Sequence, residues 1–218
     1  TCNPRQRAKQ PIPLANFPTF ARVSTHYTPY YTQRHLHMRR IFLIGYMGAG
    51  KSTLGRKLAE VLGFDFIDTD IFIESRFRER IVDMFERIGE EMFRLKEHYV
   101  IEELSGMTDC IIATGGGLPC FHDNMKLMKE TGITIYLEGS NETISKRLDY
   151  CKRTRPTIRH KNEEELRRHV AEAMLHRRPI YEQAELAVSI DHLKDEQDEQ
   201  QLAEELALKI IHLKAQEP

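Results

Sequence analysis

The stretch GYMGAGKST at residues 45–53 decides the fold of this chain, because it fits the phosphate-binding pattern G-x-x-x-x-G-K-[ST]. The apolar run 41–44 before it predicts a buried strand. The residues after it predict a helix with Leu54, Leu58, Val61 and Leu62 on one face. A glycine-rich turn that matched by chance would have no reason to lie between such a strand and such a helix. The stretch therefore indicates a strand–loop–helix unit that binds phosphate.

The residue types of this loop are those that phosphate binding requires. Glycines let backbone N–H groups approach phosphate oxygens, and the helix that starts near Lys51 directs its positive dipole end at them. The Lys51 side chain can reach the β- and γ-phosphates of a nucleotide, and the Ser52 hydroxyl can bind Mg²⁺. The loop therefore predicts a site for a nucleotide with its metal ion.

The composition argues against several classes of function. The 218 residues fit one domain and carry a net charge of −1, so no overall attraction to nucleic acid is expected. No apolar stretch approaches the roughly 18 residues of a membrane span, and the four cysteines lack the paired spacing of a zinc site. We expect a cytoplasmic protein with reduced thiols that binds neither nucleic acid nor membrane.

The two ends differ from the middle of the chain. Residues 1–37 contain no Asp or Glu, several prolines and no sustained periodicity, and Met38 stands just before the first predicted strand. They are an over-extended start, a disordered arm or an organelle transit segment, and we favour a dispensable arm. The acidic segment 191–218 has a helical stripe of leucine and isoleucine, which predicts a terminal amphipathic helix packed on the core.

Short apolar runs alternate with helical patterns between these ends. The predicted strands are 40–45, 64–67, 110–114, 133–138 and 186–190. Strands of continuous apolar character, separated by helices, predict an α/β fold with a parallel sheet that helices cover on both faces. Ligands of such sheets bind beyond the carboxyl ends of the strands. This rule selects the loop 45–52, the segment after Phe66 and the glycine run 115–117.

Two carboxylates, Asp68 and Asp70, follow the second predicted strand. At a strand exit, residues at i and i+2 can face one pocket, where one carboxylate holds Mg²⁺ and the other holds or deprotonates a substrate hydroxyl. The alternative is an N-cap, in which one of them accepts from free N–H groups of the next helix. The phosphate loop nearby favours the functional interpretation.

The glycine run 115–117 and Arg94 are weaker candidates. The run exposes backbone N–H groups to a small polar molecule, or it is only a flexible turn. Arg94 has Glu90 at i−4 and Glu97 at i+3. These three residues alone favour an exposed row of ion pairs over a clamp for an anionic substrate group.

Two basic segments follow. Residues 147–161, which include Arg155, form either a lid that closes over the nucleotide or a solvated loop. A helical pattern ends at 176–181, where Pro179 is expected to stop the helix. Arg177 either caps carbonyls at this helix end or provides a second clamp for an anion.

These motifs, in this order, resemble the shikimate kinase family. The matching stretches are GYMGAGKST at 45–53, FIDTD at 66–70, FRLKE at 93–97, TGGG at 114–117, TRP at 154–156 and RRPIY at 177–181. The resemblance covers residues 38–190, and the combination of motifs is far more specific than the phosphate loop alone. The resemblance implies a P-loop kinase-like three-layer sandwich with a five-stranded parallel sheet. It also implies a substrate-binding region at 70–105 and a mobile lid at 147–162.

The resemblance also implies an activity. It is the transfer of the ATP γ-phosphoryl group to the 3-hydroxyl of shikimate, on the route to chorismate and the aromatic amino acids. ATP and Mg²⁺ are then the cofactors, shikimate is the small-molecule partner, and we expect a monomer.

Residue roles follow from the same resemblance. Asp70, Lys51 and Arg155 are the implied catalytic residues, and Ser52 and Asp68 are the implied metal ligands. Asp70 holds and helps to deprotonate the hydroxyl, Arg94 and Arg177 grip the carboxylate, and Glu97 orients Arg94. The implied nucleotide contacts are Gly48, Ala49, Gly50, Lys51, Ser52, Thr53, Arg155 of the lid and Arg147 beside adenine. The implied shikimate contacts are Asp70, Arg94, Gly115, Gly116, Gly117 and Arg177.

The chain departs from the family pattern in the lid, where TRPTIRHKN stands in place of the RPLL of many members. A gluconate kinase shares the loop and the lid, but paired arginines suit a substrate that carries a carboxylate. A nucleotide-binding regulatory protein without catalysis would not need Asp68, Asp70, Lys51 and Ser52 together. A GTPase is disfavoured, because the guanine motif N-K-x-D is absent from the sequence.

Overall fold

The computed structural model describes residues 40–151 and 158–215. Within these ranges the chain forms five strands: β1 Arg40–Ile44, β2 Asp65–Asp68, β3 Cys110–Ala113, β4 Gly132–Glu138 and β5 Leu186–Ser189. They make one parallel sheet in the order β2-β3-β1-β4-β5. The predicted five-stranded parallel sheet is confirmed. The first and the last residue of each strand lie within one residue of the predicted bounds.

Strand β1 is the centre of the core. Ile41 pairs with Ile111 of β3 on one side and with Ile133 of β4 on the other. All four apolar residues of the run 41–44 are buried. A strand with helices over both faces has no solvent-facing side, which explains why its sequence is continuously apolar instead of alternating.

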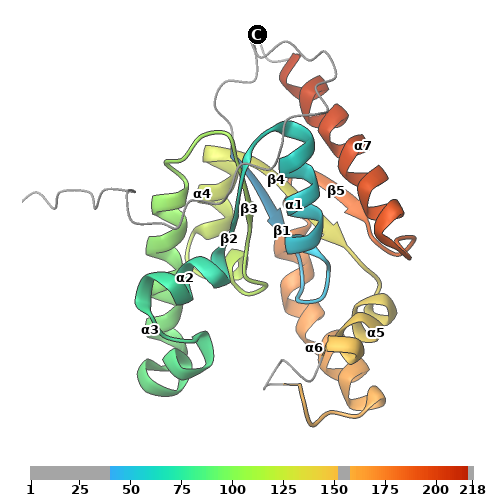
Figure 1. Cartoon of the computed structure of the whole chain (residues 1–218). Helices are drawn as coiled ribbons and strands as arrows, with labels where there is room; N and C mark the ends of the chain where they lie inside the picture. The colour runs from blue at the N-terminus through green and yellow to red at the C-terminus, as the bar shows by residue number, and fades with distance from the viewer. Residues whose placement is uncertain (1–39, 152–157, 216–218) are drawn as a thin grey trace, which may run out of the picture. The chain divides into compact units, whose positions relative to one another are not determined.

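Seven α-helices accompany the sheet over the described residues. They are α1 Lys51–Leu62, α2 Thr69–Phe77, α3 Ile81–Leu104, α4 Asn124–Thr131, α5 Asn141–Cys151, α6 Glu163–Tyr181 and α7 Glu196–Ala215. The connections β1-α1-β2 and β3-α4-β4 cross the sheet in opposite directions. Right-handed crossovers therefore place α1 and α4 on opposite faces, as Figure 1 shows. None of the described helices is long and apolar enough to cross a bilayer.

Helix α7 lies along α1 (Figure 1). It buries Leu202, Leu206 and Ile210 of the predicted stripe, and Lys57 of α1 contacts Glu196 at 3.0 Å. On α1 the buried face differs from the predicted one, because Val61 is 39% exposed. Gly55 is buried instead: a Cβ there would lie 2.5 Å from the Phe66 ring, so α1 approaches the sheet too closely for a side chain.

Helix α6 extends past the residue that was expected to stop it. Pro179 lies inside the helix, which ends at Tyr181. The proline removes one N–H from the last turn, but the amide of Glu182 donates to the carbonyl of Arg178 at 2.9 Å and closes that turn. Arg177 and Tyr181 consequently lie four residues apart on one helix, an arrangement that brings both to the carboxyl edge of the sheet.

Candidate active site

The phosphate loop joins β1 to α1 at the carboxyl edge of the sheet. Gly48 and Gly50 have φ angles of 83° and 89°, in the left-handed region that glycine adopts without strain. A Cβ on Gly48 would also lie 3.0 Å from the Leu148 side chain. The first turn of α1 begins directly after the loop, so its backbone N–H groups face the position that a phosphate would occupy.

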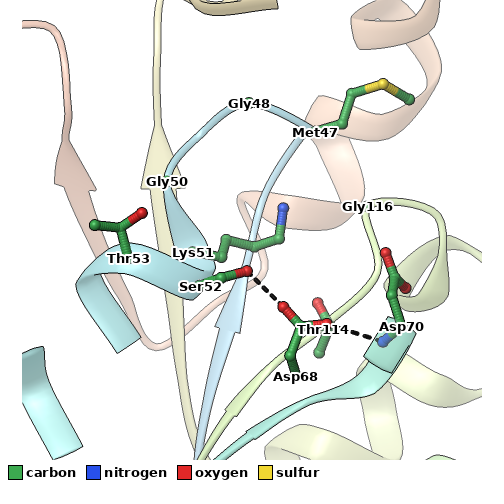
Figure 2. A pocket seen from close by; sticks show the side chains of 10 residues that line it. All are labelled: Met47, Gly48, Gly50, Lys51, Ser52, Thr53, Asp68, Asp70, Thr114 and Gly116. Atoms are coloured by element: carbon green, nitrogen blue, oxygen red, sulfur yellow. Dashed lines mark hydrogen bonds between the residues drawn. The ribbon is translucent and has the colours of Figure 1, made fainter. Parts of the chain in front are cut away.

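The Lys51 side chain extends beneath this loop (Figure 2). Its Nζ donates to the carbonyl oxygens of Gly45 at 2.8 Å and Tyr46 at 2.9 Å. The residue is only 8% exposed. The ammonium group is therefore fixed against the loop and already lies inside the pocket.

Ser52 and Asp68 form the second feature of the site. The Ser52 hydroxyl donates to Oδ2 of Asp68 at 2.5 Å, while Oδ1 accepts from the amides of Asp70 at 3.0 Å and Ile71 at 3.3 Å. The N-cap interpretation of Asp68 is confirmed, because one oxygen caps α2, and the other oxygen contacts the phosphate loop, where the metal role stays a prediction. A hydroxyl and a carboxylate oxygen in contact are hard ligands, which fits Mg²⁺. Among the described residues there is no cluster of three or more His, Cys, Asp or Glu suited to a metal.

A cavity of about 320 Å³ brings these residues together (Figure 2). Its predicted members are Gly48, Gly50, Lys51, Ser52, Thr53, Asp68, Asp70 and Gly116, and Met47 and Thr114 also line it. Ala49, also in the loop, is buried and does not line the cavity. The cavity is thus bounded by groups suited to phosphate on one side and by the Asp70 carboxylate on the other.

The glycine run packs closely against the side chains of the site. The amide of Gly115 donates to Thr69 Oγ1 at 2.8 Å. A Cβ on Gly115 would lie 2.6 Å from Oδ1 of Asp70 and 3.2 Å from Oε1 of Glu97. A Cβ on Gly117 would lie 2.6 Å from Nη1 of Arg94. The run therefore touches the carboxylates at one end and the Arg94 guanidinium at the other.

Arg94 is largely buried: it forms both expected ion pairs, with Glu90 and Glu97, but the row is not an exposed one. Its side chain is 11% exposed and that of Glu97 3%. Nη1 donates to Glu97 at 2.6 Å, Nη2 donates to Glu90 at 2.9 Å, and the Phe121 ring centre lies 4.2 Å from the guanidinium. Because the aromatic ring covers the guanidinium plane and two carboxylates fix its edges, the arrangement favours a clamp for an anion.

The burial of this pair changes its titration. Burial raises the pKa of Glu97 to about 7, with Arg94 opposing the shift and Asp70 adding to it. Burial works to lower the pKa of Arg94, but Glu97 and Glu90 outweigh it, and the pKa of Arg94 is raised. Arg94 therefore stays charged, while Glu97 changes charge near neutral pH.

Three further arginines were predicted at the site. Arg177 lies on α6 with its guanidinium 5.3 Å from the Tyr46 ring centre, and it acts to lower the pKa of Glu97. Arg147 lies at the edge of the phosphate loop, where it donates to the carbonyl of Ala49 at 3.4 Å and to the chain around 190–193. Arg155 falls outside the described residues.

Thr69, Phe121 and Tyr181 contact the site, although sequence reasoning gave them no role. Thr69 binds Gly115, Phe121 covers Arg94, and the Tyr181 hydroxyl donates to the carbonyl of Gly116 at 2.5 Å. Thr69 stands between the two aspartates and Tyr181 ends the RRPIY stretch, so their motifs were visible. Phe121 had no sequence signal, because its contact joins segments that are distant in the chain.

Known proteins are similar to this chain in sequence and in fold. A family model described as shikimate kinase matches residues 47–212, a range that includes most of α7. The shikimate kinase of Parabacteroides distasonis is 42% identical over 174 residues, which cover 80% of this chain and 100% of that protein. A crystal structure of shikimate kinase from Bacteroides thetaiotaomicron has a TM-score of 0.77 and 38% identity, covering 80% and 99% of the two chains. The shikimate kinase from Acinetobacter baumannii, solved in complex with shikimate, has a TM-score of 0.69 and 33% identity, covering 80% and 94%.

Proposed function

This chain belongs to the shikimate kinase family, and we propose that it transfers the γ-phosphoryl group of ATP to the 3-hydroxyl of shikimate. The products are shikimate 3-phosphate and ADP. The observation that carries the proposal is the position of Asp70. Its carboxylate lines the same cavity as Lys51 and Ser52, and it contacts the glycine run that leads to Arg94. One carboxylate therefore lies between a phosphate site and a site for an anionic group.

The nucleotide side of the site is built from the loop 48–53. Backbone N–H groups and the Lys51 ammonium spread the charge of the transferring phosphoryl group, and most of the acceleration comes from positioning and electrostatics. Ser52 and Asp68 would hold Mg²⁺, which neutralises phosphate charge when it is bound. Arg147 would flank the adenine, and Arg155 would close onto the phosphates from a lid at 147–162.

The acceptor side would bind shikimate through its carboxylate and its hydroxyls. Arg94 and Arg177 would grip the carboxylate, since a buried guanidinium fixed in plane binds an anion with little loss of conformational freedom. Gly115, Gly116 and Gly117 would meet the ring hydroxyls through the backbone. Asp70 would accept a hydrogen bond from the 3-hydroxyl, direct its oxygen at the phosphorus and take its proton as the bond forms.

We also propose the finer points of organisation. The kinase domain spans 38–190, α7 packs on its core, and residues 1–37 are a dispensable arm. We propose a monomer in the cytoplasm with no nucleic-acid or membrane partner. The free thiols of Cys110 and Cys120 among the described residues support a reducing compartment.

A coupled ADP-release assay tests the function. ATP and Mg²⁺ are supplied with shikimate, quinate or gluconate in parallel, and a reaction without an acceptor measures background ATP hydrolysis. We expect ADP release above background with shikimate and none with gluconate, which lacks the ring that the glycine run would contact. Equal rates with gluconate, or ATP binding without turnover on any acceptor, would contradict the proposal.

A further inference from the structure

We propose that Tyr181 is a positioning residue of the acceptor site, whose hydroxyl fixes the distance between the glycine run and the phosphate loop. This inference rests on the proposed function, since the run is assigned to the acceptor there. Tyr181 would touch neither substrate nor nucleotide. It acts through the backbone of Gly116, and its side chain also interacts with Arg177 and Cys120.

The first step is the contact itself. Tyr181 is the last residue of α6 and is fully buried, and its hydroxyl donates to the carbonyl of Gly116 at 2.5 Å. Burial raises the pKa of Tyr181, so the phenol keeps its proton and remains a donor. The bond to this carbonyl is only partly buried, so a carbonyl that loses the phenol would turn toward another partner, and the run would shift with it.

The second step is the place of Gly116 between two sites. A Cβ on this residue would lie 3.2 Å from the amide nitrogen of Met47 and 3.6 Å from the carbonyl oxygen of Gly45. The backbone of Gly116 therefore packs directly on the phosphate loop, and Gly116 also lines the cavity. A shift of this residue changes the gap that an acceptor hydroxyl and a phosphate must share.

The third step is that two side chains from opposite sides anchor the run. Thr69 of α2 accepts from the amide of Gly115, and Tyr181 of α6 donates to the carbonyl of Gly116. On the same face of α6, the Arg177 guanidinium lies over the ring of Tyr46 in the phosphate loop. The end of α6 thus contacts both the loop and the run, and Tyr181 supplies the hydrogen bond between helix and run.

The chain contains a matched control for this hydroxyl. Tyr136 of β4 is 1% exposed, and its ring centre lies 5.3 Å from that of Tyr181. Among the described residues its hydroxyl has no hydrogen-bond partner. Tyr136→Phe therefore removes the same atom from the same cluster of rings without removing a contact to the run.

The experiment compares the wild-type chain, Tyr181→Phe and Tyr136→Phe by calorimetric titration with shikimate and, separately, with ATP, followed by steady-state kinetics. We expect Tyr181→Phe to weaken shikimate binding and lower kcat/KM for shikimate about tenfold, with ATP affinity changed less than about twofold. Tyr136→Phe should match the wild type. Tyr181→p-aminophenylalanine restores an N–H donor at the same position and should recover most of the shikimate affinity.

Thermal unfolding covers the case in which Tyr181→Phe is too unstable for titration. In Tyr181→Phe, the rise in Tm caused by saturating ATP should persist, and the rise in Tm caused by shikimate should become smaller. Unchanged shikimate affinity in Tyr181→Phe, equal losses for ATP and shikimate, or an equal loss in Tyr136→Phe would each overturn the inference. A wild-type chain that neither binds nor phosphorylates shikimate would overturn the proposed function itself.

Discussion

The Ser52 hydroxyl donates a 2.5 Å hydrogen bond to Oδ2 of Asp68, so the start of α1 and the end of β2 meet at one pair of oxygens. The other carboxylate oxygen accepts from the amides of Asp70 and Ile71 and caps α2. A carboxylate has two oxygens, and here each contacts a different element. The capping role of Asp68 and its proposed metal-binding role can therefore be separated by substitution.

Asp68→Asn should keep the cap and weaken the metal site. An amide oxygen can accept from the same N–H groups, so the free energy of unfolding should change by less than about 0.5 kcal/mol. The lost charge should raise the half-saturating Mg²⁺ concentration at least about tenfold. Urea unfolding and a Mg²⁺ titration of ADP release measure the two effects. Asp68→Ala is the comparison, since it should lose about 1 kcal/mol as well. An unchanged Mg²⁺ dependence would remove Asp68 from the metal site.

Asp70→Asn should abolish most turnover while ATP still binds. The amide cannot take the proton of the acceptor hydroxyl, so kcat should fall by about 10² to 10⁴. Rapid kinetics with shikimate and calorimetry with ATP separate the two effects. Asp65→Asn is a control, because Asp65 is an exposed aspartate at the start of β2, the end of that strand away from Asp70. Normal turnover in Asp70→Asn would refute its role as base.

Arg94→Lys should weaken shikimate binding although the charge is kept. Lysine cannot reproduce the planar fork that Glu97 and Glu90 fix and that Phe121 covers, so KM for shikimate should rise about tenfold to a hundredfold. KM for ATP should not change. Arg87→Lys is the control, since Arg87 also makes a two-pronged bond, to Glu79, on the exposed part of α3. A rise in the KM values for both shikimate and ATP would indicate a general loss of structure instead of a specific loss of carboxylate binding.

Local patterns predicted much of this structure, and two of the failures share a non-local cause. The strands and the phosphate loop follow from neighbours in the sequence, because apolar runs and glycine positions are local properties. The burial of Arg94 could not be predicted, since the ring of Phe121 covers it from a distant segment. The exposure of Val61 depends on the packing of Gly55 against Phe66, which is equally non-local.

The titration of Glu97 should be visible as a pH-dependent cost to stability. The folded chain raises its pKa from 4.5 to about 7, so the folded state holds this proton more tightly than the unfolded state. The contribution to stability is therefore fully present below pH 4.5 and is lost as the pH rises through 7. A shift of this size corresponds to roughly 3 kcal/mol.

The Glu97→Gln variant has an uncharged side chain at this position at every pH, so it should not show this loss of stability. Its free energy of unfolding, minus that of the wild type, should climb as the pH rises from about 5 to about 8 and then level off. Arg94, left with Glu90 as its carboxylate partner, adds a constant offset, because its raised pKa keeps it charged throughout this range. Urea unfolding at a series of pH values measures the difference.

Glu90→Gln is the control, because it removes the exposed partner of the same arginine. Its free energy of unfolding, minus that of the wild type, should not climb with pH. A flat difference for Glu97→Gln would mean that Glu97 is already ionised well below neutral pH, and that Arg94 outweighs its burial.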